Sequence, residues 1–197
     1  MSDQLLDEVL PAAQAGQAWA LRVVYDHLAP RVHAYLKARG AAEPEDLTSE
    51  VFLAVFPRLA SVTGGAAGLR TFTFSVAHAR LVDDLRKRSR REPTVPYEAD
   101  RDTRTTASAE DVAVESVHTQ QVRRLLDGLG DDQRDVLVLR ILGDLTVEQV
   151  ALALGKSEGA VKQLQRRGLI SLRASLESLA PHEPHPAPSV DTDGVTL

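Results

Sequence analysis

The chain has 197 residues, of which 43% are hydrophobic and 4% aromatic, and its 23 Lys and Arg against 28 Asp and Glu residues give a net charge of −5. It contains no cysteine, which excludes disulfides and thiolate metal sites. No apolar run approaches the roughly 18 residues needed to cross a membrane, and the acidic N-terminus MSDQLLDEVL lacks the basic start of a signal peptide. Because Ala, Leu, Val and Arg dominate, these features predict an all-α, soluble, cytoplasmic protein.

Composition divides the chain into four segments. Residues 1–91 carry apolar residues at helical spacing. Residues 92–115 contain two prolines, two arginines and seven acidic residues, a net charge of −5, which predicts a flexible acidic linker. Residues 116–179 are again helical in pattern, and residues 180–197, with four prolines and no periodicity, predict a disordered tail. The sequence therefore predicts two small helical domains.

The first segment predicts three main helices. An apolar series at roughly helical spacing marks the first of them: Trp19, Val23, Leu28, Val32 and Leu36. Pro30 predicts a break or kink near its middle, and Gly40 predicts its end. The second helix is expected to start near Pro44. The three glycines of residues 61–68 predict a flexible loop after it.

The third predicted helix is long and runs from about Arg70 to Arg90. Its apolar face is expected to join the core through Phe74, Ala77, Leu81 and Leu85. The opposite face begins with Phe72 and ends in arginines, and residues 80–91 have a net charge of +4. These residues alone leave two interpretations open: a solvated basic end that suits the helix dipole, or a nucleic-acid-binding face.

Residues 145–168, LTVEQVALALGKSEGAVKQLQRRG, predict two helices joined by a turn. Thr146 and Gln149 form a capping box that starts a helix over residues 147–154, Gly155 permits the left-handed backbone that ends it, and Ser157 caps a second helix. Three positions have the residue types that a helix-turn-helix requires at its fifth, ninth and fifteenth places: Ala151, Gly155 and Val161. A helical hairpin packed only for stability remains the alternative.

The exposed face of that second helix has the chemistry of a DNA reader. Residues 156–173 carry a net charge of +4, and Lys, Arg and Gln side chains are suitable donors for guanine and adenine edges in the major groove. The N-terminal half of such a helix is the part that reaches base edges. The sequence does not separate base contacts from phosphate contacts.

Both halves of the chain resemble one family, the small extracytoplasmic-function sigma factors of the sigma-70 superfamily. PEDLTSEVFLAVFPRL (residues 44–59) and LRTFTFSVAHARLVDDLRKRSRR (residues 69–91) resemble region 2 of these proteins. LLDGLGDDQRDVLVLRILGDLTVEQVALALGKSEGAVKQLQRRGLISLR (residues 125–173) resembles region 4. The resemblance implies a region 2 domain over residues 1–91 and a region 4 helix-turn-helix domain over residues 116–179.

The resemblance also implies roles for particular residues. Contacts with core RNA polymerase are expected from Asp46, Leu47, Glu50 and Phe52. Contacts with the −10 promoter element are expected from Phe72, Ser75, Ala79, Arg80, Arg86, Arg88 and Arg90. Contacts with the −35 element are expected from Lys156, Gly159, Lys162, Gln163, Arg166 and Arg167. No catalytic residue, cofactor or metal site is expected, and the six histidines show no ligand spacing.

Several positions depart from the family's pattern. Members commonly have Gln where Ser49 stands, Trp where Phe56 and Phe72 stand, and Asn where Ala79 stands. Phe72 can still stack on a base, since stacking needs only a π-face. Loss of the amide at Ala79 predicts a shifted or relaxed −10 readout, with more weight on the loop before the helix.

The expected partners are core RNA polymerase, promoter DNA and an anti-sigma factor, with no membrane insertion. Two basic segments of +4 separated by a linker of −5 predict weak DNA binding by the free protein. One alternative is a free-standing helix-turn-helix regulator, which does not require copurification with polymerase. Another is a helical adaptor that touches no DNA, for which replacing Lys162 or Arg166 would be silent.

Overall fold

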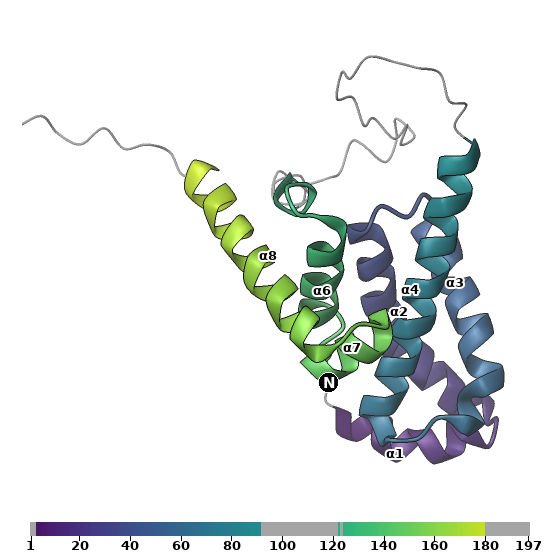
Figure 1. The fold of residues 1–197 in the computed structure, drawn as a ribbon. Coiled ribbons are helices and arrows are strands. Elements are labelled where there is room, and N and C mark those ends of the chain that lie inside the picture. The colour runs from purple at the N-terminus through teal and green to yellow at the C-terminus, as the bar shows by residue number, and fades with distance from the viewer. Residues whose placement is uncertain (1–2, 92–121, 123, 180–197) are drawn as a thin grey trace, which may run out of the picture.

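The computed structural model describes residues 3–91, 122 and 124–179, and these residues form helices and no strand (Figure 1). The first bundle comprises α1 (Asp3–Gln14), α2 (Ala18–Ala38), α3 (Pro44–Val55), the 3-10 helix η1 (Phe56–Ser61) and α4 (Gly65–Arg91). The second bundle comprises α6 (Asp131–Ile141), α7 (Val147–Leu154) and α8 (Glu158–Leu179). The prediction of an all-α chain with two helical domains is confirmed.

The core of the first bundle is built around three buried aromatic side chains. Tyr35 of α2 meets Phe74 of α4 edge-on with ring centroids 5.9 Å apart, and Phe52 of α3 packs against Tyr25 at 4.8 Å. The predicted core face of α4 is confirmed, because Phe74, Ala77 and Leu81 are fully buried. Aromatic pairs in such edge-on contact add about 0.5–1.5 kcal/mol to the free energy gained by burial.

Pro30 does not end α2, which runs unbroken from Ala18 to Ala38. The proline is exposed on the outer face, while Leu28 and Val32 on either side of it are fully buried. Burial of this apolar face offsets the backbone hydrogen bond that a proline removes from a helix interior. Gly40 follows the helix with φ +79°, so the expected end at this glycine is confirmed.

The predicted loop over residues 61–68 is shorter in the structure, because α4 begins at Gly65 rather than near Arg70. Gly64 and Gly65 have φ of +83° and +61°, which only glycine adopts without strain. The carboxylate of Asp7 then accepts a hydrogen bond of 2.6 Å from the Ala66 amide in the first turn. A side chain from another helix therefore caps the first turn of α4, which begins about five residues earlier than the sequence predicted.

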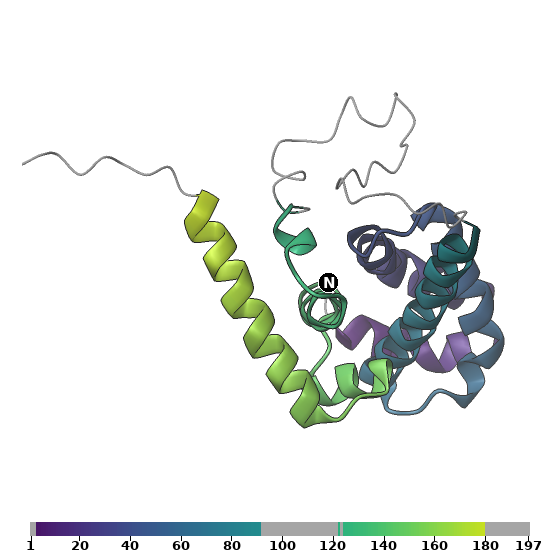
Figure 2. The same ribbon diagram turned by 45° about the horizontal axis from the view of Figure 1, so that its top comes forward.

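The second bundle contains the predicted helix-turn-helix. The Thr146–Gln149 capping box is present, Gly155 is left-handed with φ 62°, and Ser157 accepts a hydrogen bond from the Ala160 amide at 3.2 Å. Ala151 and Val161 are buried where the two helices cross, as their positions predicted. Figure 2 shows α8 standing apart from the first bundle, with α6 and α7 between them.

The linker predicted for residues 92–115 and the tail predicted for residues 180–197 lie outside the described residues. Within the described part of the chain, no helix combines the length and the apolar character that spanning a bilayer requires.

Gly68 packs closely on the loop that precedes α4, and this contact can be tested. A Cβ atom at Gly68 would lie 1.8 Å from the carbonyl oxygen of Thr63, so the backbone would have to move. We expect Gly68→Ala to lower the free energy of unfolding by about 1–3 kcal/mol, the usual cost of overpacking, as measured by urea denaturation.

Gly159→Ala is the matched control, because nothing lies within 4 Å of a Cβ atom at this helical glycine. It should leave stability unchanged or slightly raised, since alanine favours helix. Equal losses in the two variants would contradict the close approach at Gly68.

Candidate nucleic-acid interface

One face of α8 is open to solvent along its N-terminal half. The residues predicted to contact the −35 element include an exposed set on this face: Gly159, Lys162, Gln163, Arg166 and Arg167. The opposite face packs on α6 through Gly168, where an added Cβ would lie 2.7 Å from Leu137. This packing fixes the rotation of α8, so the structure brings the predicted donors together on one exposed surface.

Two lysines near this surface are held by acidic neighbours. Lys156 is half-buried and pairs with Asp132 of α6 at 2.9 Å, and Lys162 pairs with Glu158 at 3.4 Å. The Lys162 pair is exposed and at i, i+4 spacing, so it stabilises the helix by a few tenths of a kcal/mol at most. Lys162 can therefore exchange this partner for a DNA phosphate at little cost.

The residues predicted to contact the −10 element divide into two groups along α4. Phe72 and Ser75 are half-buried and face α7 across a cleft of about 530 Å³. Ala79 and the arginines toward the C-terminal end are exposed, namely Arg80, Arg86 and Arg90. Arg88 is half-buried and donates a hydrogen bond of 2.8 Å to the Gly40 carbonyl. The structure thus separates a covered aromatic end from an open basic end.

The cover over Phe72 comes from the second bundle. Gln149 and Leu152 of α7 line the cleft opposite Phe72 and Ser75, and the Gln149 amide donates to the carbonyl of Ala67 at 3.3 Å. Sequence reasoning did not find this contact, because Gln149 was already assigned to the capping box and its second bond is to a residue 82 positions away.

The start of α4, at the edge of this cleft, is held by α1. The Asp7 carboxylate caps the Ala66 amide, and the Gln14 amide donates to the carbonyls of Leu59 and Val62 at 3.2 and 2.8 Å. Asp7 and Gln14 therefore hold the loop before α4, the segment that the sequence predicted to carry more weight in recognition of the −10 element. Nothing in the sequence indicated these contacts, since the bonded residues lie 45–59 positions away along the chain.

The residues predicted to contact polymerase lie on α3 but do not all reach its surface. Asp46 and Glu50 are exposed and Leu47 is half-buried. Phe52 is only 2% exposed and packs in the core against Tyr25 and Phe56, so its side chain is not on the surface of α3. Leu53, which the sequence analysis did not select, is 74% exposed beside Glu50 and adds an apolar side chain to the acidic surface.

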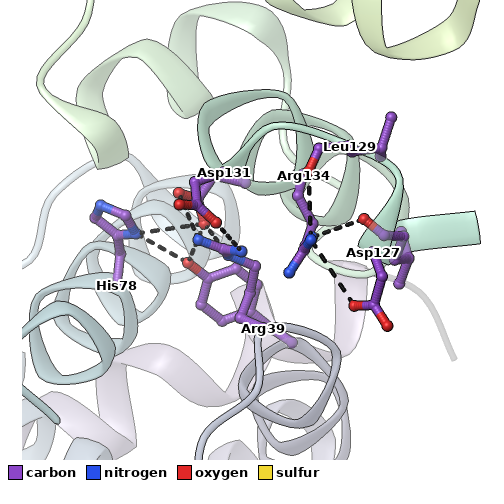
Figure 3. A network of polar contacts seen from close by, with 9 residues as sticks. Arg39, His78, Asp127, Leu129, Asp131 and Arg134 are labelled. Atoms are coloured by element: carbon purple, nitrogen blue, oxygen red, sulfur yellow. Dashed lines mark hydrogen bonds and ion pairs between the residues drawn. The ribbon is translucent and has the colours of Figure 1, made fainter. Parts of the chain in front are cut away.

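A buried polar network joins the two bundles. The Arg39 guanidinium of α2 donates to the Asp135 carboxylate of α6 from Nε at 2.5 Å and from Nη2 at 3.3 Å, and the Tyr35 hydroxyl donates to the same carboxylate at 3.3 Å. Asp131 lies 3.5 Å from Arg39 Nη1. Figure 3 shows Arg39 and His78 pointing from the first bundle toward the helix that carries Asp131. Sequence reasoning missed this network entirely.

Burial and charge set the protonation states in this network. Burial raises the pKa of Tyr35 well above its usual value, and Asp135 raises it further, so the phenol stays protonated. Burial alone would lower the pKa of Arg39, but Asp135 raises it above its usual value. Burial also lowers the pKa of His78, which favours the neutral ring. Because Tyr35 donates to Asp135, neutral His78 donates its Nδ1–H to the phenol oxygen at 2.9 Å.

A second ion pair between the bundles joins the first part of α4 to the turn before α7. Arg70 of α4, whose side chain is buried, approaches Asp144 at 3.3 Å in the turn before α7. Asp144 has φ +51°, a left-handed conformation that aspartate tolerates better than most residues. The two ion pairs and the Gln149 bond together fix how the second bundle sits on α2 and α4 of the first bundle.

Comparison with known families places both bundles in one group. The family model for Sigma-70 region 2 matches residues 24–91, and that for Sigma-70 region 4 matches residues 125–174. The chain is 32% identical over 168 residues to the ECF RNA polymerase sigma factor BldN of Streptomyces coelicolor, covering 84% of this chain and 63% of BldN. It is 32% identical over 183 residues to the ECF RNA polymerase sigma factor SigD of Mycobacterium tuberculosis, covering 88% of this chain and 84% of SigD.

Two solved structures share the fold. CnrH, in complex with the cytosolic domain of CnrY, superposes with a TM-score of 0.64 at 17% identity over 88% of this chain and 98% of CnrH. The sigma factor RpoE of Bartonella quintana, in complex with the anti-sigma factor NepR, gives a TM-score of 0.63 at 20% identity over 79% of this chain and 96% of RpoE.

The cap that α1 places on α4 leads to a second prediction. Asp7→Ala removes the acceptor for the Ala66 amide, and loss of such a cap costs about 0.5–2 kcal/mol. We expect the free energy of unfolding to fall by about 1 kcal/mol in chemical denaturation. Glu8→Ala, an exposed neighbour on the same helix, should have little effect. An Asp7→Ala variant as stable as the unaltered chain would show that the cap contributes nothing.

Proposed function

This chain belongs to the extracytoplasmic-function (ECF) RNA polymerase sigma factors, and we propose that it binds core RNA polymerase, directs it to specific promoters and promotes the opening of promoter DNA. The observation that carries the proposal is the presence, in one chain, of an exposed basic face on α8 and of α4 with its aromatic start and basic end. A free-standing regulator needs only the first of these. The chain acts where polymerase acts, in the cytoplasm, and as an initiation factor rather than an enzyme.

Recognition of the −35 element is assigned to α8. Its exposed donors stand at the N-terminal half of the second helix of a helix-turn-helix, the part that enters the major groove. Arg and Lys suit guanine, and Gln suits adenine. Lys156, which is paired with Asp132, lies at the margin of this surface and is suited to a phosphate contact.

Opening of the −10 element is assigned to α4. Flipping a base costs a few kcal/mol in lost stacking and pairing. Stacking of a flipped base on Phe72 would return about 1–3 kcal/mol, and the exposed arginines at the C-terminal end of α4 are placed to hold backbone phosphates. Because Ala79 offers no hydrogen bond, the identity of the flipped base depends on the segment before α4.

Polymerase binding is assigned to the exposed side of α3. Asp46 and Glu50 present negative charge to a basic partner surface, and Leu53 supplies an apolar contact next to them. An anti-sigma factor is also proposed as a partner, since the RpoE structure that shares the fold contains one. Such a partner would act by covering these surfaces.

Transcription with purified components tests the proposal directly. Core polymerase with this chain should initiate at specific start sites that core polymerase alone does not use, and the chain should copurify with core polymerase. Start sites mapped after overproduction in cells then define the promoter elements. Failure of the chain to bind core polymerase would favour a free-standing regulator. Failure of the chain to contact DNA in either assay would favour an adaptor.

If α8 reads the −35 element, replacing Arg166 should change both the strength of promoter use and the base preference at one position. Arg166→Ala should weaken use of a mapped promoter by an amount equivalent to about 1–3 kcal/mol if Arg166 contacts a base, and should change preference at one −35 position. Arg173→Ala is the matched control, because Arg173 lies farther along α8 and pairs with Glu177 at 2.9 Å. Equal effects of the two replacements on every promoter variant would refute base recognition by Arg166.

A further inference from the structure

We propose that Arg39 and Tyr35 form a binding site for a backbone phosphate of single-stranded promoter DNA, and that the Asp135 carboxylate occupies this site while the two bundles are docked. The inference rests on the proposed function, because it assigns a further DNA contact to the first bundle. It differs from the −10 contacts named above, which all lie on α4.

The geometry at Asp135 is that of an anion in a preformed site. Its carboxylate accepts three hydrogen bonds, two from the Arg39 guanidinium and one from the Tyr35 hydroxyl, and all three donors belong to the first bundle. A guanidinium presents its paired N–H groups to carboxylates and phosphates in the same fork geometry. A phosphate oxygen pair can therefore take the place of the Asp135 oxygens without a change in Arg39.

The burial of this site depends on docking. The Arg39 side chain is 5% exposed and that of Asp135 is 7% exposed. The two carboxylates that contact Arg39, from Asp131 and Asp135, both lie on α6. When α6 moves away, the positive charge of Arg39 loses both partners at once. A phosphate can then pair with the freed guanidinium in the same fork geometry.

The position of the site fits a strand that passes over Phe72. Phe72 and Ser75 lie on the side of α4 covered by α7, and His78, which contacts Tyr35, lies on the side that meets α6. Phe72 and His78 are six residues apart, about 9 Å along the helix axis. A strand with one base stacked on Phe72 can thus reach Arg39 before it arrives at the arginines that end α4.

Docking and single-strand binding therefore exclude each other. The second bundle covers Phe72 with α7 and occupies Arg39 with α6. The α8 face remains exposed in the docked form. DNA that binds only the undocked form must overcome the docking equilibrium, so its apparent affinity is lowered by the undocked fraction.

The test uses the full chain and a labelled short oligothymidylate, because a phosphate site needs no particular base. Affinity is measured by fluorescence anisotropy over a series of salt concentrations. The variants are Asp135→Asn, Arg39→Gln and the double variant. The controls are Asp26→Asn and Arg22→Gln, which remove an exposed Arg–Asp pair elsewhere on α2.

We expect Asp135→Asn to raise the affinity about tenfold, as loss of a charge-assisted contact that holds the docked form predicts. Arg39→Gln breaks the same docking contact and exposes Phe72 as well, but it removes the phosphate contact, so any gain should be clearly smaller than that of Asp135→Asn. The double variant should lose the part of the gain that Arg39 supplies. Its slope of log affinity against log salt should be smaller than that of Asp135→Asn by about 0.7, the value for one phosphate on a single strand. Both controls should bind as the unaltered chain does.

Two results would overturn the proposal. If Arg39→Gln raises the affinity as much as Asp135→Asn, Arg39 only holds the bundles together. If Asp135→Asn leaves the affinity unchanged, no masked phosphate site exists.

A second undocking variant guards against a folding defect in Asp135→Asn. Asp144→Asn removes the ion pair that Arg70 makes between the bundles, at a left-handed position that asparagine tolerates, and leaves the Arg39–Asp135 pair intact. It should also raise the affinity, and adding Arg39→Gln should reduce that gain. An equal gain with and without Arg39 would again overturn the site.

The proposed function and the phosphate site at Arg39 can be disproved independently. Promoter-specific transcription by the unaltered chain tests the proposed function without reference to Arg39. If transcription is observed but the Arg39 variants behave as the controls do, only the phosphate site is wrong.

Discussion

A guanidinium and a carboxylate, both shielded from solvent, meet where the two helical bundles dock. Removing two charges from water costs several kcal/mol per ion, and the cost is recovered only if both are well hydrogen-bonded. Arg39 and Asp135 meet this condition through three hydrogen bonds, with Tyr35 as the third partner. The pair is therefore selective for one docked geometry, and every surface that this geometry covers or leaves open follows from it.

Docking affects the two DNA-facing helices unequally. The aromatic start of α4 lines a cleft with α7, whereas the basic face of α8 is open to solvent, and α8 itself stands apart from the first bundle (Figures 1 and 2). The face of α8 proposed to contact duplex DNA is open to solvent in the docked form, whereas Phe72, proposed to stack on an unpaired base, is half-buried. In the proposed function this order suits initiation, since a promoter must be located before its strands are separated.

The sequence predicted what local chemistry determines. Thr146, Gln149 and Gly155 define the helix-turn-helix because caps and turns involve residues a few positions apart. Contacts between distant segments were not predictable in this way. The pairing of Arg39 with Asp135 spans 96 residues, and neither residue stands out in its own helix. The early start of α4 was missed for the same reason, because its cap comes from α1 rather than from the glycine-rich segment itself.

The anchoring of residues 62–66 by α1 has a consequence for how the chain can diverge. Asp7 and Gln14 lie before residue 24, where the match to region 2 begins, yet they hold the backbone at the edge of the cleft that Phe72 lines. Changes in the N-terminal helix are thus transmitted to a surface proposed to select promoters. If promoter choice is to be preserved, a substitution in α1 must be matched by a compensating substitution in residues 62–66. Promoter preference can then evolve through the first helix while α4 itself stays constant.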